Sequence, residues 1–510
     1  MNSAKKYNWK NDTESQIVQF YAGKHVFLTG CTGFCGTLIL EKLLRTCTDI
    51  GKIYIMIRPK KNVTMQKRME ELFQCDVFDK LRAMNPNFTD KVIMIHGDLY
   101  KPDLGLSAED RQRLVNNVNI IIHNASMVYF KAKVSVILRT NVLGTQKMLE
   151  LAAECPNLNV FVYMSTAYSH HYTKTIEEKF YAPPCDLKMI EDIIRVDEEN
   201  AAGISKEALD DIVGKWMNQY AFSKAVTEGI VEDFGKRRSL PCFVYRPSIV
   251  TETQYEPIKA WVGNKNGPVS LTLGLGLGVL HVMHMDENLR LDFIPGDYTN
   301  NSLLAAIWDY VEHRETDEPQ VYNYASSDWQ PFVTKVLTQN FRTAIEKYPT
   351  SKMIWYPTLY MVSNKLLFLI LHTIWHVIPA IIIDAVLLTR GKKPKATEML
   401  FKVLKHHKIL LYFISSSWVI KTDRTKRILS RMNAADLKLF PFDLKQIDWA
   451  KKMEMGLICV RRLMKEPYDS IPDARKKLQK LRRIHYTVVT LLGLFSLFLM
   501  YRIMCILSFI

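Results

Sequence analysis

Short runs of apolar residues alternate with segments of helical periodicity between about residues 20 and 170. The apolar runs contain few polar positions, which is typical of strands buried on both faces of a sheet. Between the first two runs, from Gly33 to Arg45, apolar residues recur at the spacing of a helix. Strands that alternate with helices predict an α/β fold with a doubly wound parallel sheet. The expected strands are HVFLTG (25–30), KIYIMIR (52–58), VIMIHGD (92–98), NIIIHNAS (119–126) and VFVYMST (160–166).

The alternation continues from about residue 220 to 340, with a helix after Tyr220 and a strand at FVYRPSIV (243–250). The sequence beyond this strand is rich in loop-forming residues, as in NKNGPV and LGLGLG. We expect this irregular region to form the substrate side of the molecule.

Two long apolar stretches follow after residue 350. LLFLILHTIWHVIPAIIIDAVLL (366–388) is long enough to cross a bilayer, but Pro379 and Asp384 are costly in lipid. We expect 366–388 to form a helical hairpin that lies on the membrane or covers an acyl channel, and the sequence leaves a full span open. YTVVTLLGLFSLFLMYRIMCILSFI (486–510) is interrupted by Arg502, whose long stem can reach the far interface. It is expected to be a transmembrane anchor; the alternative is a buried helix of a soluble protein.

The net charge of +16 is concentrated between these two stretches. From Arg390 to Arg483 there are 25 Lys and Arg residues against 9 Asp and Glu residues, so the rest of the chain sums to zero. Such a block is compatible with nucleic-acid binding or with a solvated basic surface. Because it lies beside apolar segments, an anionic membrane surface is the better partner, and no nucleic-acid ligand is expected.

The cysteines and the N-terminus indicate a cytosolic setting for the rest of the chain. The nine cysteines include no CxxC pair and no cluster at metal-ligand spacing, so neither a disulfide framework nor a bound metal is expected. The first 20 residues are polar and lack the apolar core of a signal peptide.

TGCTGFCG (29–36) connects the first expected strand to the first expected helix. In this context Gly30 permits a tight turn, Gly33 lets the backbone approach a pyrophosphate, and Gly36 permits close helix packing. The pyrophosphate would bind exposed N–H groups at the positive end of the helix. The motif predicts a Rossmann-like fold that binds a dinucleotide; the alternative is a plain glycine-rich turn.

The end of the second strand indicates which dinucleotide is bound. A site for NAD would place a carboxylate there, whereas this chain has Arg58, followed by Lys60 and Lys61. A guanidinium can bind the 2′-phosphate of NADP through two hydrogen bonds, and a carboxylate would repel it. NADPH is therefore the expected cofactor, although Arg58 could also be an ordinary solvent-facing charge.

Two other strands end in polar or small residues at the edge of the sheet where such folds bind ligands. Asp98 and Leu99 close one strand, and Asn124 and Ala125 close the next. We expect the first pair to contact the adenine side of the cofactor and the second pair the nicotinamide side.

YAFSK places Tyr220 and Lys224 four residues apart, on one face of a helix. A lysine cation beside a tyrosine can lower the pKa of its hydroxyl, which then gives a proton to a carbonyl oxygen as hydride arrives. Ser165 and Thr166 end the strand 160–166, and a hydroxyl there can hold the substrate oxygen. YxxxK alone occurs often by chance, but its combination with the glycine loop and this hydroxyl pair predicts a reductase site.

The ordered set of motifs resembles extended short-chain dehydrogenases/reductases and, more narrowly, the fatty acyl-CoA reductase (male-sterility) family. The resemblance covers nearly the whole chain. The matching segments are TGCTGFCGTLILEKLLR (29–45), IMIRPKK (55–61), HNASMVYF (123–130), TNVLGT (140–145), MSTAY (164–168), YAFSKAVTE (220–228), RPSIV (246–250), WVGNKNGP (261–268) and DFIPGDYTNN (292–301).

The resemblance implies that Tyr220 is the proton donor, that Lys224 binds the ribose and tunes Tyr220, and that Thr166, in preference to Ser165, polarises the carbonyl. Asn141 would support Lys224 through a water molecule. One departure is Gly296, where the family more often has a larger apolar residue. The implied cofactor contacts are Thr29, Gly30, Thr32, Gly33, Phe34, Gly36, Arg58, Lys60, Asp98, Leu99, Asn124, Ala125, Tyr220, Lys224, Pro247 and Ile249.

The implied reaction is the NADPH-dependent reduction of a long-chain fatty acyl-CoA to the fatty alcohol, a precursor of waxes and ether lipids. The thioester would be reduced to a hemithioacetal, CoA would leave, and the bound aldehyde would be reduced again, without a cysteine nucleophile. The expected location is the endoplasmic reticulum membrane, with the peroxisomal membrane as the alternative and the catalytic domain in the cytosol.

The expected domain organisation follows the changes in composition. A polar segment (1–20) precedes an NADP-binding reductase domain with its substrate region (21–350). An apolar membrane-associated segment (351–395), a basic, mainly helical C-terminal domain (396–483) and the anchor (486–510) complete the chain.

Two other classes of protein remain as alternatives on this scaffold. A membrane-bound steroid dehydrogenase or a sugar-nucleotide epimerase would keep the catalytic motifs. The basic C-terminal domain distinguishes this chain from them, because such relatives lack it. A non-catalytic NADP-binding scaffold would commonly lack the tyrosine or the lysine. The sequence leaves acyl-chain length, unsaturation and oligomeric state undecided, and a homo-oligomer is compatible with it.

Overall fold

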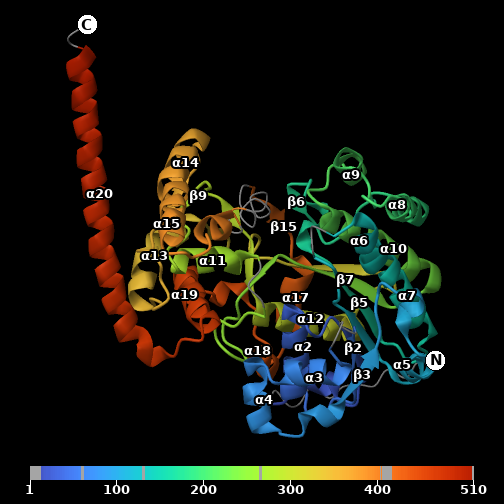
Figure 1. Cartoon of the computed structure of the whole chain (residues 1–510). Helices are drawn as coiled ribbons and strands as arrows, with labels where there is room; N and C mark the ends of the chain where they lie inside the picture. The colour runs from blue at the N-terminus through green and yellow to red at the C-terminus, as the bar shows by residue number, and fades with distance from the viewer. Residues whose placement is uncertain are drawn as a thin grey trace. The chain divides into compact units, whose positions relative to one another are not determined.

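The computed structural model describes residues 13–58, 63–128, 132–263, 267–401, 404 and 416–507. The chain forms two compact units (Figure 1). The first, here called the sheet unit, comprises Met1–Asn264, Leu291–Phe332 and Ser417–Ile447. The second, the helical unit, comprises Lys265–Arg290, Val333–Ser416 and Asp448–Ile510. Each unit is therefore assembled from segments that are far apart in the sequence.

The centre of the sheet unit is a seven-stranded parallel sheet in the order β12-β7-β5-β4-β1-β2-β3. This order confirms the predicted doubly wound sheet, because the chain winds outward in both directions from β1. All five strands expected before residue 170 are present. The strands are β1 (Val26–Thr29), β2 (Ile53–Ile57), β3 (Val92–His96), β4 (Ile120–His123), β5 (Val160–Met164), β7 (Cys242–Pro247) and β12 (Gln320–Tyr324).

Helices cover both faces of this sheet, which explains why its strands are apolar on both sides. On one face lie α1 (Gln16–Tyr21), α2 (Phe34–Thr46) and α12 (Gly296–His313). On the other lie α5 (Ala108–Asn117), α7 (Gly144–Glu154) and α10 (Gln219–Arg238). In register, Thr29 of β1 lies opposite both Met56 of β2 and His123 of β4, so the carboxyl ends of the strands meet at one edge.

The strand expected at 243–250 is divided in two. The main sheet keeps β7 only as far as Pro247, after which the Ser248 backbone N–H donates to Tyr324. β8 (Ile249–Thr251) then leaves the sheet and pairs with β11 (Phe293–Pro295). The apolar pattern is the same on both sides of Ser248, so it could not reveal this change of partner.

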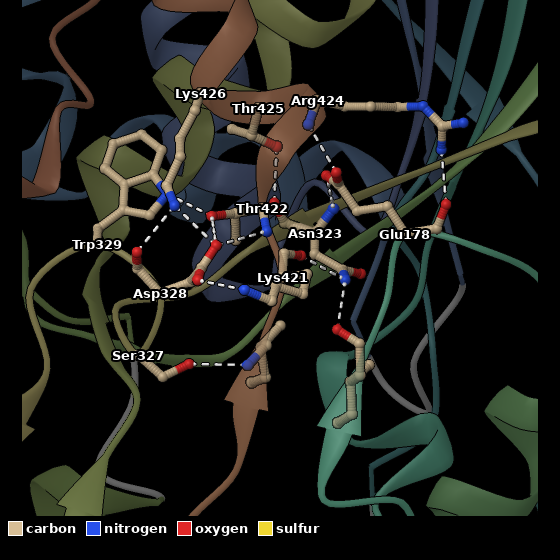
Figure 2. A network of polar contacts seen from close by, with 12 residues as sticks. Glu178, Asn323, Ser327, Asp328, Trp329, Lys421, Thr422, Arg424, Thr425 and Lys426 are labelled. Atoms are coloured by element: carbon tan, nitrogen blue, oxygen red, sulfur yellow. Dashed lines mark hydrogen bonds and ion pairs between the residues drawn. The ribbon is translucent and has the colours of Figure 1, made fainter.

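Part of the basic C-terminal sequence belongs to the sheet unit. β15 (Val419–Ile420) pairs with β6 (Thr175–Ile176), and α17 (Asp423–Arg431) contacts α12 and β12. Figure 2 shows the polar network that holds this segment: the Glu178 carboxylate accepts hydrogen bonds from the backbone N–H groups of Asn323 and Arg424. Asp328 pairs with two lysines, Lys421 and Lys426. The domain boundaries expected from composition stay a prediction, but residues 417–447 pack with the reductase sheet.

The helical unit packs α11 (Pro268–Gly276) and α13 (Lys335–Lys347) against α19 (Lys452–Leu463). Small residues permit the close approach of α11 and α19. A β-carbon on Gly276 would lie 3.2 Å from side-chain carbons of Leu457 and Val460, and one on Gly456 would lie 2.7 Å from Thr272.

The apolar stretch 366–388 lies in one continuous helix, Lys365–Thr389, and the expected hairpin is therefore wrong. It consists of α14 (Lys365–His372), the π-helical turn η6 (Thr373–Val377) and α15 (Ile378–Thr389). Pro379 is the second residue after the π-turn, and a widened turn of this kind accommodates a residue that cannot donate a backbone hydrogen bond.

This helix buries polar residues and exposes apolar ones, the opposite of a helix on the surface of a soluble protein. The buried positions are His376, Ala380 and Asp384, whereas the leucines and isoleucines point outward. The Asp384 carboxylate accepts hydrogen bonds from the backbone N–H groups of Lys395, Ala396 and Thr397, so its charge is satisfied inside the unit. The exposed apolar residues include Leu366, Leu367, Leu369, Ile370, Ile374, Ile378, Ile381, Ile382, Ile383, Val386 and Leu388.

The last helix, α20 (Ile471–Leu507), begins with the basic cluster and continues into the apolar terminal stretch. An 18-residue stretch within 468–505 has a mean hydropathy of 2.0 and contains no buried residue, and one within the helix 365–389 has a mean hydropathy of 2.3. Both are long and apolar enough to cross a membrane. Where α20 becomes apolar, the His485 ring stacks on Trp375 of η6 and accepts a hydrogen bond from Trp355.

Candidate active site

A cavity of about 670 Å³ opens at the carboxyl edge of the sheet, in the sheet unit. Parallel sheets of this type bind ligands at that edge, where the strand order reverses. The structure brings most of the predicted site residues together there. Those that line the cavity are Gly30, Thr32, Gly33, Phe34, Arg58, Asp98, Leu99, Asn124, Ala125, Ser165, Thr166, Tyr220, Lys224 and Pro247.

The loop between β1 and α2 has the shape that a dinucleotide requires. Gly30 has φ +73°, and a β-carbon there would lie 2.8 Å from the Ala125 backbone nitrogen. A β-carbon on Gly36 would lie 2.1 Å from the Gly30 carbonyl oxygen, so only glycine lets the helix approach the loop. Gly33 is the N-cap of α2 and lines the cavity. The N-terminus of a 13-residue helix therefore stands at the cavity wall, which suits a pyrophosphate.

Thr29 does not line the cavity, but its hydrogen bonds support the loop. Thr29 Oγ1 lies 2.9 Å from His123 Nδ1 and accepts a hydrogen bond from the Ala125 backbone at 3.0 Å. His123 Nε2 lies 2.9 Å from the Thr145 hydroxyl, and burial lowers the pKa of His123 to about 3. A neutral imidazole therefore joins the ends of β1 and β4, a role that the sequence did not indicate.

Two arginines reach the cavity after β2. Arg58 follows the strand, as predicted, and Arg68 comes from α3 (Met65–Phe73). The Arg68 guanidinium donates to the Arg58 carbonyl oxygen, which holds the two residues together. No sequence pattern singled out Arg68, because it lies ten residues away in a helix of mixed polarity. Lys60 lies outside the described residues.

Tyr220 and Lys224 lie in the first two turns of α10, where the Asn218 side chain caps the helix by accepting from the Ala221 N–H. Lys224 Nζ donates to the Met164 carbonyl at 2.6 Å, and burial lowers the pKa of Lys224 to about 7. Burial raises the pKa of Tyr220, the opposite of the lowering expected from the lysine. The phenol is therefore protonated at neutral pH, the form that a proton donor needs.

The two hydroxyls at the end of β5 have different surroundings. Ser165 Oγ donates its hydrogen to the buried carboxylate of Glu228. Thr166 caps a short 3₁₀ turn, where its Oγ1 accepts from the Tyr168 backbone N–H at 3.3 Å, and its side chain is half-buried in the cavity wall. Both residues line the cavity, but only the Ser165 hydroxyl donates its hydrogen to Glu228. Thr166 is thus the better placed of the two to donate to a ligand in the cavity.

Asn141 lies behind the wall in the π-helical turn η4 (Arg139–Leu143). Its amide exchanges hydrogen bonds of 2.7 and 3.1 Å with the Met127 backbone and donates to Ser223 Oγ at 3.0 Å. These bonds fix the loop after β4, which reaches the cavity through Ser126, Met127 and Val128. The predicted link from Asn141 to Lys224 through water stays a prediction.

The departure at Gly296 is explained by Phe34. A β-carbon on Gly296 would lie 2.7 Å from Phe34 Cζ, and the Phe34 ring packs on Trp261 with ring centroids 5.6 Å apart. A larger residue at 296 would displace this ring from the cavity wall. Near Pro247 the wall is completed by Ser248 and Val250, and Ile249 between them is not among the lining residues, since successive side chains of a strand point to opposite faces.

Comparisons with known proteins identify the family of this chain. An NAD-binding family model described as "Male sterility protein" matches residues 28–303, and a second model of the same description matches residues 375–466. Fatty acyl-CoA reductase wat of Drosophila melanogaster is 34% identical over 488 residues, which cover 93% of this chain and 91% of that protein. Fatty acyl-CoA reductase 1 of Rattus norvegicus is 34% identical and covers 93% of this chain and 92% of that protein.

Solved structures show the same fold at low identity. The terminal R domain of the myxalamid biosynthetic pathway has a TM-score of 0.56 at 19% identity, covering 87% of this chain and 92% of that chain. The reductase domain of a Mycobacterium tuberculosis nonribosomal peptide synthetase has a TM-score of 0.57 at 16% identity, covering 86% and 92%. The sequence motifs, the cavity and the full-length relatives lead to one assignment: the chain is an oxidoreductase with a nicotinamide cofactor and belongs to the fatty acyl-CoA reductase family, the male sterility proteins.

Proposed function

We propose that this protein reduces long-chain fatty acyl-CoA to the fatty alcohol with NADPH, through a bound aldehyde and with release of CoA. The observation that carries the proposal is a single cavity that combines a dinucleotide-binding loop, two arginines and the Thr166, Tyr220 and Lys224 side chains. The substrate class follows from the names of the relatives that match over nine-tenths of the chain.

Arg58 and Arg68 support NADPH as the cofactor. Together they place two positive charges at the wall beyond β2, where a cofactor specific for NAD would need a carboxylate. Two guanidinium groups can bind the 2′-phosphate with charge-assisted hydrogen bonds. Gly30, Gly33 and the N-terminus of α2 would hold the pyrophosphate, and Lys224 the ribose.

When bound, NADPH supplies the hydride for each of the two reductions. Thr166 would hold the carbonyl oxygen, and Tyr220, which its raised pKa keeps protonated, would give that oxygen a proton. Burial raises the pKa of Cys35, a cysteine of the cavity wall, to about 12. A thiol in that state is a poor nucleophile, which favours direct reduction of the thioester over transfer of the acyl group to the enzyme.

Incubation of membranes that contain the protein with palmitoyl-CoA and NADPH tests the proposal directly. We expect hexadecanol to accumulate with oxidation of NADPH, and NADH to support the reaction poorly. Membranes with the same protein that oxidise no NADPH, or that require a sterol or a sugar nucleotide in place of the acyl-CoA, would refute it.

Replacing Thr166 by Val should lower kcat by about 10²-fold or more, because a lost hydrogen bond to a developing oxyanion costs roughly that much. Val keeps the shape of Thr while removing the hydroxyl. Ser165→Ala is the matched comparison and should lose less, because the Ser165 hydrogen is already given to Glu228. Single-turnover rates with palmitoyl-CoA measure both, and the reverse order of effects would assign the carbonyl to Ser165.

We also propose that α20 anchors the protein in the membrane of the endoplasmic reticulum, or alternatively of the peroxisome, with the catalytic site in the cytosol. The stretch after Tyr486 is long enough for a span of about 30 Å. The cluster that precedes it would remain on the cytosolic side by the positive-inside rule. The basic residues are Arg475, Lys476, Lys477, Lys480, Arg482 and Arg483.

The helix 365–389 would add a second contact with the same membrane surface. Its outward face is apolar while His376 and Asp384 are buried, an arrangement suited to lipid rather than water. The contact between Trp375 and His485 places η6 beside the start of the anchor, where aromatic residues favour the membrane interface. This arrangement supports a helix that lies in one leaflet.

Truncation after Arg483 should convert the protein from an integral to a peripheral membrane protein. We expect the shortened chain to sediment with membranes at neutral pH through the helix 365–389 but to be released by alkaline carbonate, because no span remains. Full-length protein resists carbonate in the matched control. A truncated chain that also resists carbonate would show that α20 is not the principal anchor.

A further inference from the structure

Three buried polar side chains outside the cavity lining, Glu228, Arg246 and His170, take no part in the chemistry proposed above. Glu228 Oε1 accepts hydrogen bonds from Ser165 Oγ and from Arg246 Nε at 3.0 Å. Glu228 Oε2 accepts from Arg246 Nη2 at 2.5 Å and lies 3.0 Å from His170 Nε2. The side chains of Glu228, Arg246 and His170 are at most 1% exposed, so the cluster is closed to solvent.

A buried ion pair of this kind is weak evidence for stability, because removing two charges from water costs about as much as their attraction returns. Burial by itself raises the pKa of Glu228, but the Arg246 charge and the His170 hydrogen bond outweigh it, so the pKa lies well below its ordinary value. Glu228 is therefore a fixed negative charge, and a functional reason for keeping it inside the protein is needed.

The position of Glu228 on α10 supplies that reason. It lies four residues after Lys224 and eight after Tyr220, so all three share one face of the helix. Its partner Ser165 is the residue directly before Thr166 at the end of β5. Glu228 thus connects, through one carboxylate, the helix that carries the proton donor and the strand end that carries the carbonyl-binding hydroxyl.

The Glu228 charge also acts on Lys224. On β5 this lysine faces the Tyr163 ring, 4.5 Å from Nζ, and on β4 it is near His123; on its own helix it is near Tyr220 and Glu228. Burial keeps the two tyrosines and the histidine neutral, because it raises the pKa of both tyrosines and lowers the pKa of His123. Of these four neighbours, Glu228 is the charged one, and it favours the protonated amine.

We propose that Glu228 is a positioning residue of the reductase site: it takes the Ser165 hydrogen, which leaves Thr166 as the hydroxyl for the substrate, and its charge favours the protonated form of Lys224. This inference rests on the proposed function and adds a residue to the same site. It also explains why Arg246 and His170 are buried behind the wall, since they hold the carboxylate in its ionised form.

Glu228→Gln, made in the full-length protein, tests the charge while keeping the size of the side chain. Activity that needs protonated Lys224 falls as the pH rises through the pKa of Lys224. Without the carboxylate that pKa is lower, so the alkaline fall in kcat should move to lower pH by about one unit. The affinity for NADPH, measured from NADPH fluorescence in the absence of acyl-CoA, should also begin to weaken at a lower pH than in the wild type. Glu232→Gln is the matched control, because Glu232 is one turn further along α10 and pairs with the surface residue Lys236.

Glu228→Asp separates the two roles, since it keeps the charge and shortens its reach to Ser165. We expect an unshifted pH profile and a kcat lowered by about 10-fold or more, because small displacements of catalytic groups have effects of that size. If both variants keep the kcat and the pH profile of the wild type and show only a lower melting temperature, Glu228 is a structural residue. If Glu228→Gln does not fold, a folded Glu228→Asp with unchanged kcat overturns the inference by itself. Absence of acyl-CoA reduction in the wild type would instead contradict the proposed function.

Discussion

Tyr220→Phe should lower the rate of alcohol formation by about 10²- to 10⁴-fold, the usual contribution of general acid catalysis. Phe fills the same space, so the cavity and the position of Lys224 are preserved. The binding of NADPH should stay close to that of the wild type, because the phenol hydroxyl is proposed to act on the substrate oxygen. Pre-steady-state reduction of palmitoyl-CoA measures the first effect, and fluorescence titration with NADPH measures the second.

The control for this change is Tyr255→Phe, in which the same atom is removed from an exposed tyrosine. Near-normal turnover by Tyr220→Phe would show that another group gives the proton. A parallel loss of turnover and of NADPH affinity would indicate that Tyr220 mainly shapes the cofactor site. Both results would require a new assignment of the acid.

Arg58→Asp should reverse the preference for NADPH over NADH. Hydrogen bonds to a charged group contribute about 1.5–3 kcal/mol, which corresponds to a loss of about 10- to 100-fold in kcat/KM for NADPH. The introduced carboxylate adds repulsion against the 2′-phosphate, while NADH lacks this group and should be little affected. Steady-state kinetics with both cofactors measure the ratio.

Arg58→Gln separates the lost attraction from the added repulsion, and we expect it to have an intermediate ratio. Arg68→Gln should also lower the preference for NADPH, because its guanidinium lies beside the Arg58 backbone at the same wall. An unchanged NADPH/NADH ratio in Arg58→Asp and in the Arg68 variant would place the recognition of the phosphate elsewhere.

Residues whose role depends on local geometry could be predicted from the sequence. Unbroken apolar runs gave the strands, and the order of strand, glycine turn and helix located the cofactor loop. Gly30 and Gly36 have roles that no other residue could fill, since a β-carbon at either would collide with neighbouring atoms. Arg58 was predictable because a strand end in such a sheet has a known function.

Residues that act through long-range contacts could not be predicted. Glu228, Arg246 and His170 meet from three different elements, and Arg68 reaches the cavity from a helix with no distinctive pattern. The chain changes its sheet partner after Pro247, and nothing in the apolar pattern marks that point.

The apolar segments show a different limit of sequence reasoning. Pro379 and Asp384 suggested a hairpin because each is costly in a long apolar helix. The structure satisfies both: a π-turn precedes the proline, and three backbone N–H groups bind the carboxylate. The cost of a polar residue depends on partners that are distant in the sequence, so composition alone overestimated it.

The central claim, that one site performs both reductions of a fatty acyl thioester, is tested most directly with isotopically labelled cofactor. The detergent-solubilised protein is incubated with palmitoyl-CoA and NADPH that carries deuterium at the transferred position, and the product is examined by mass spectrometry. The account predicts hexadecanol with two deuterium atoms on C1 and two NADPH consumed for each alcohol. Hexadecanal as the end product, or an alcohol that carries a single deuterium, would contradict it.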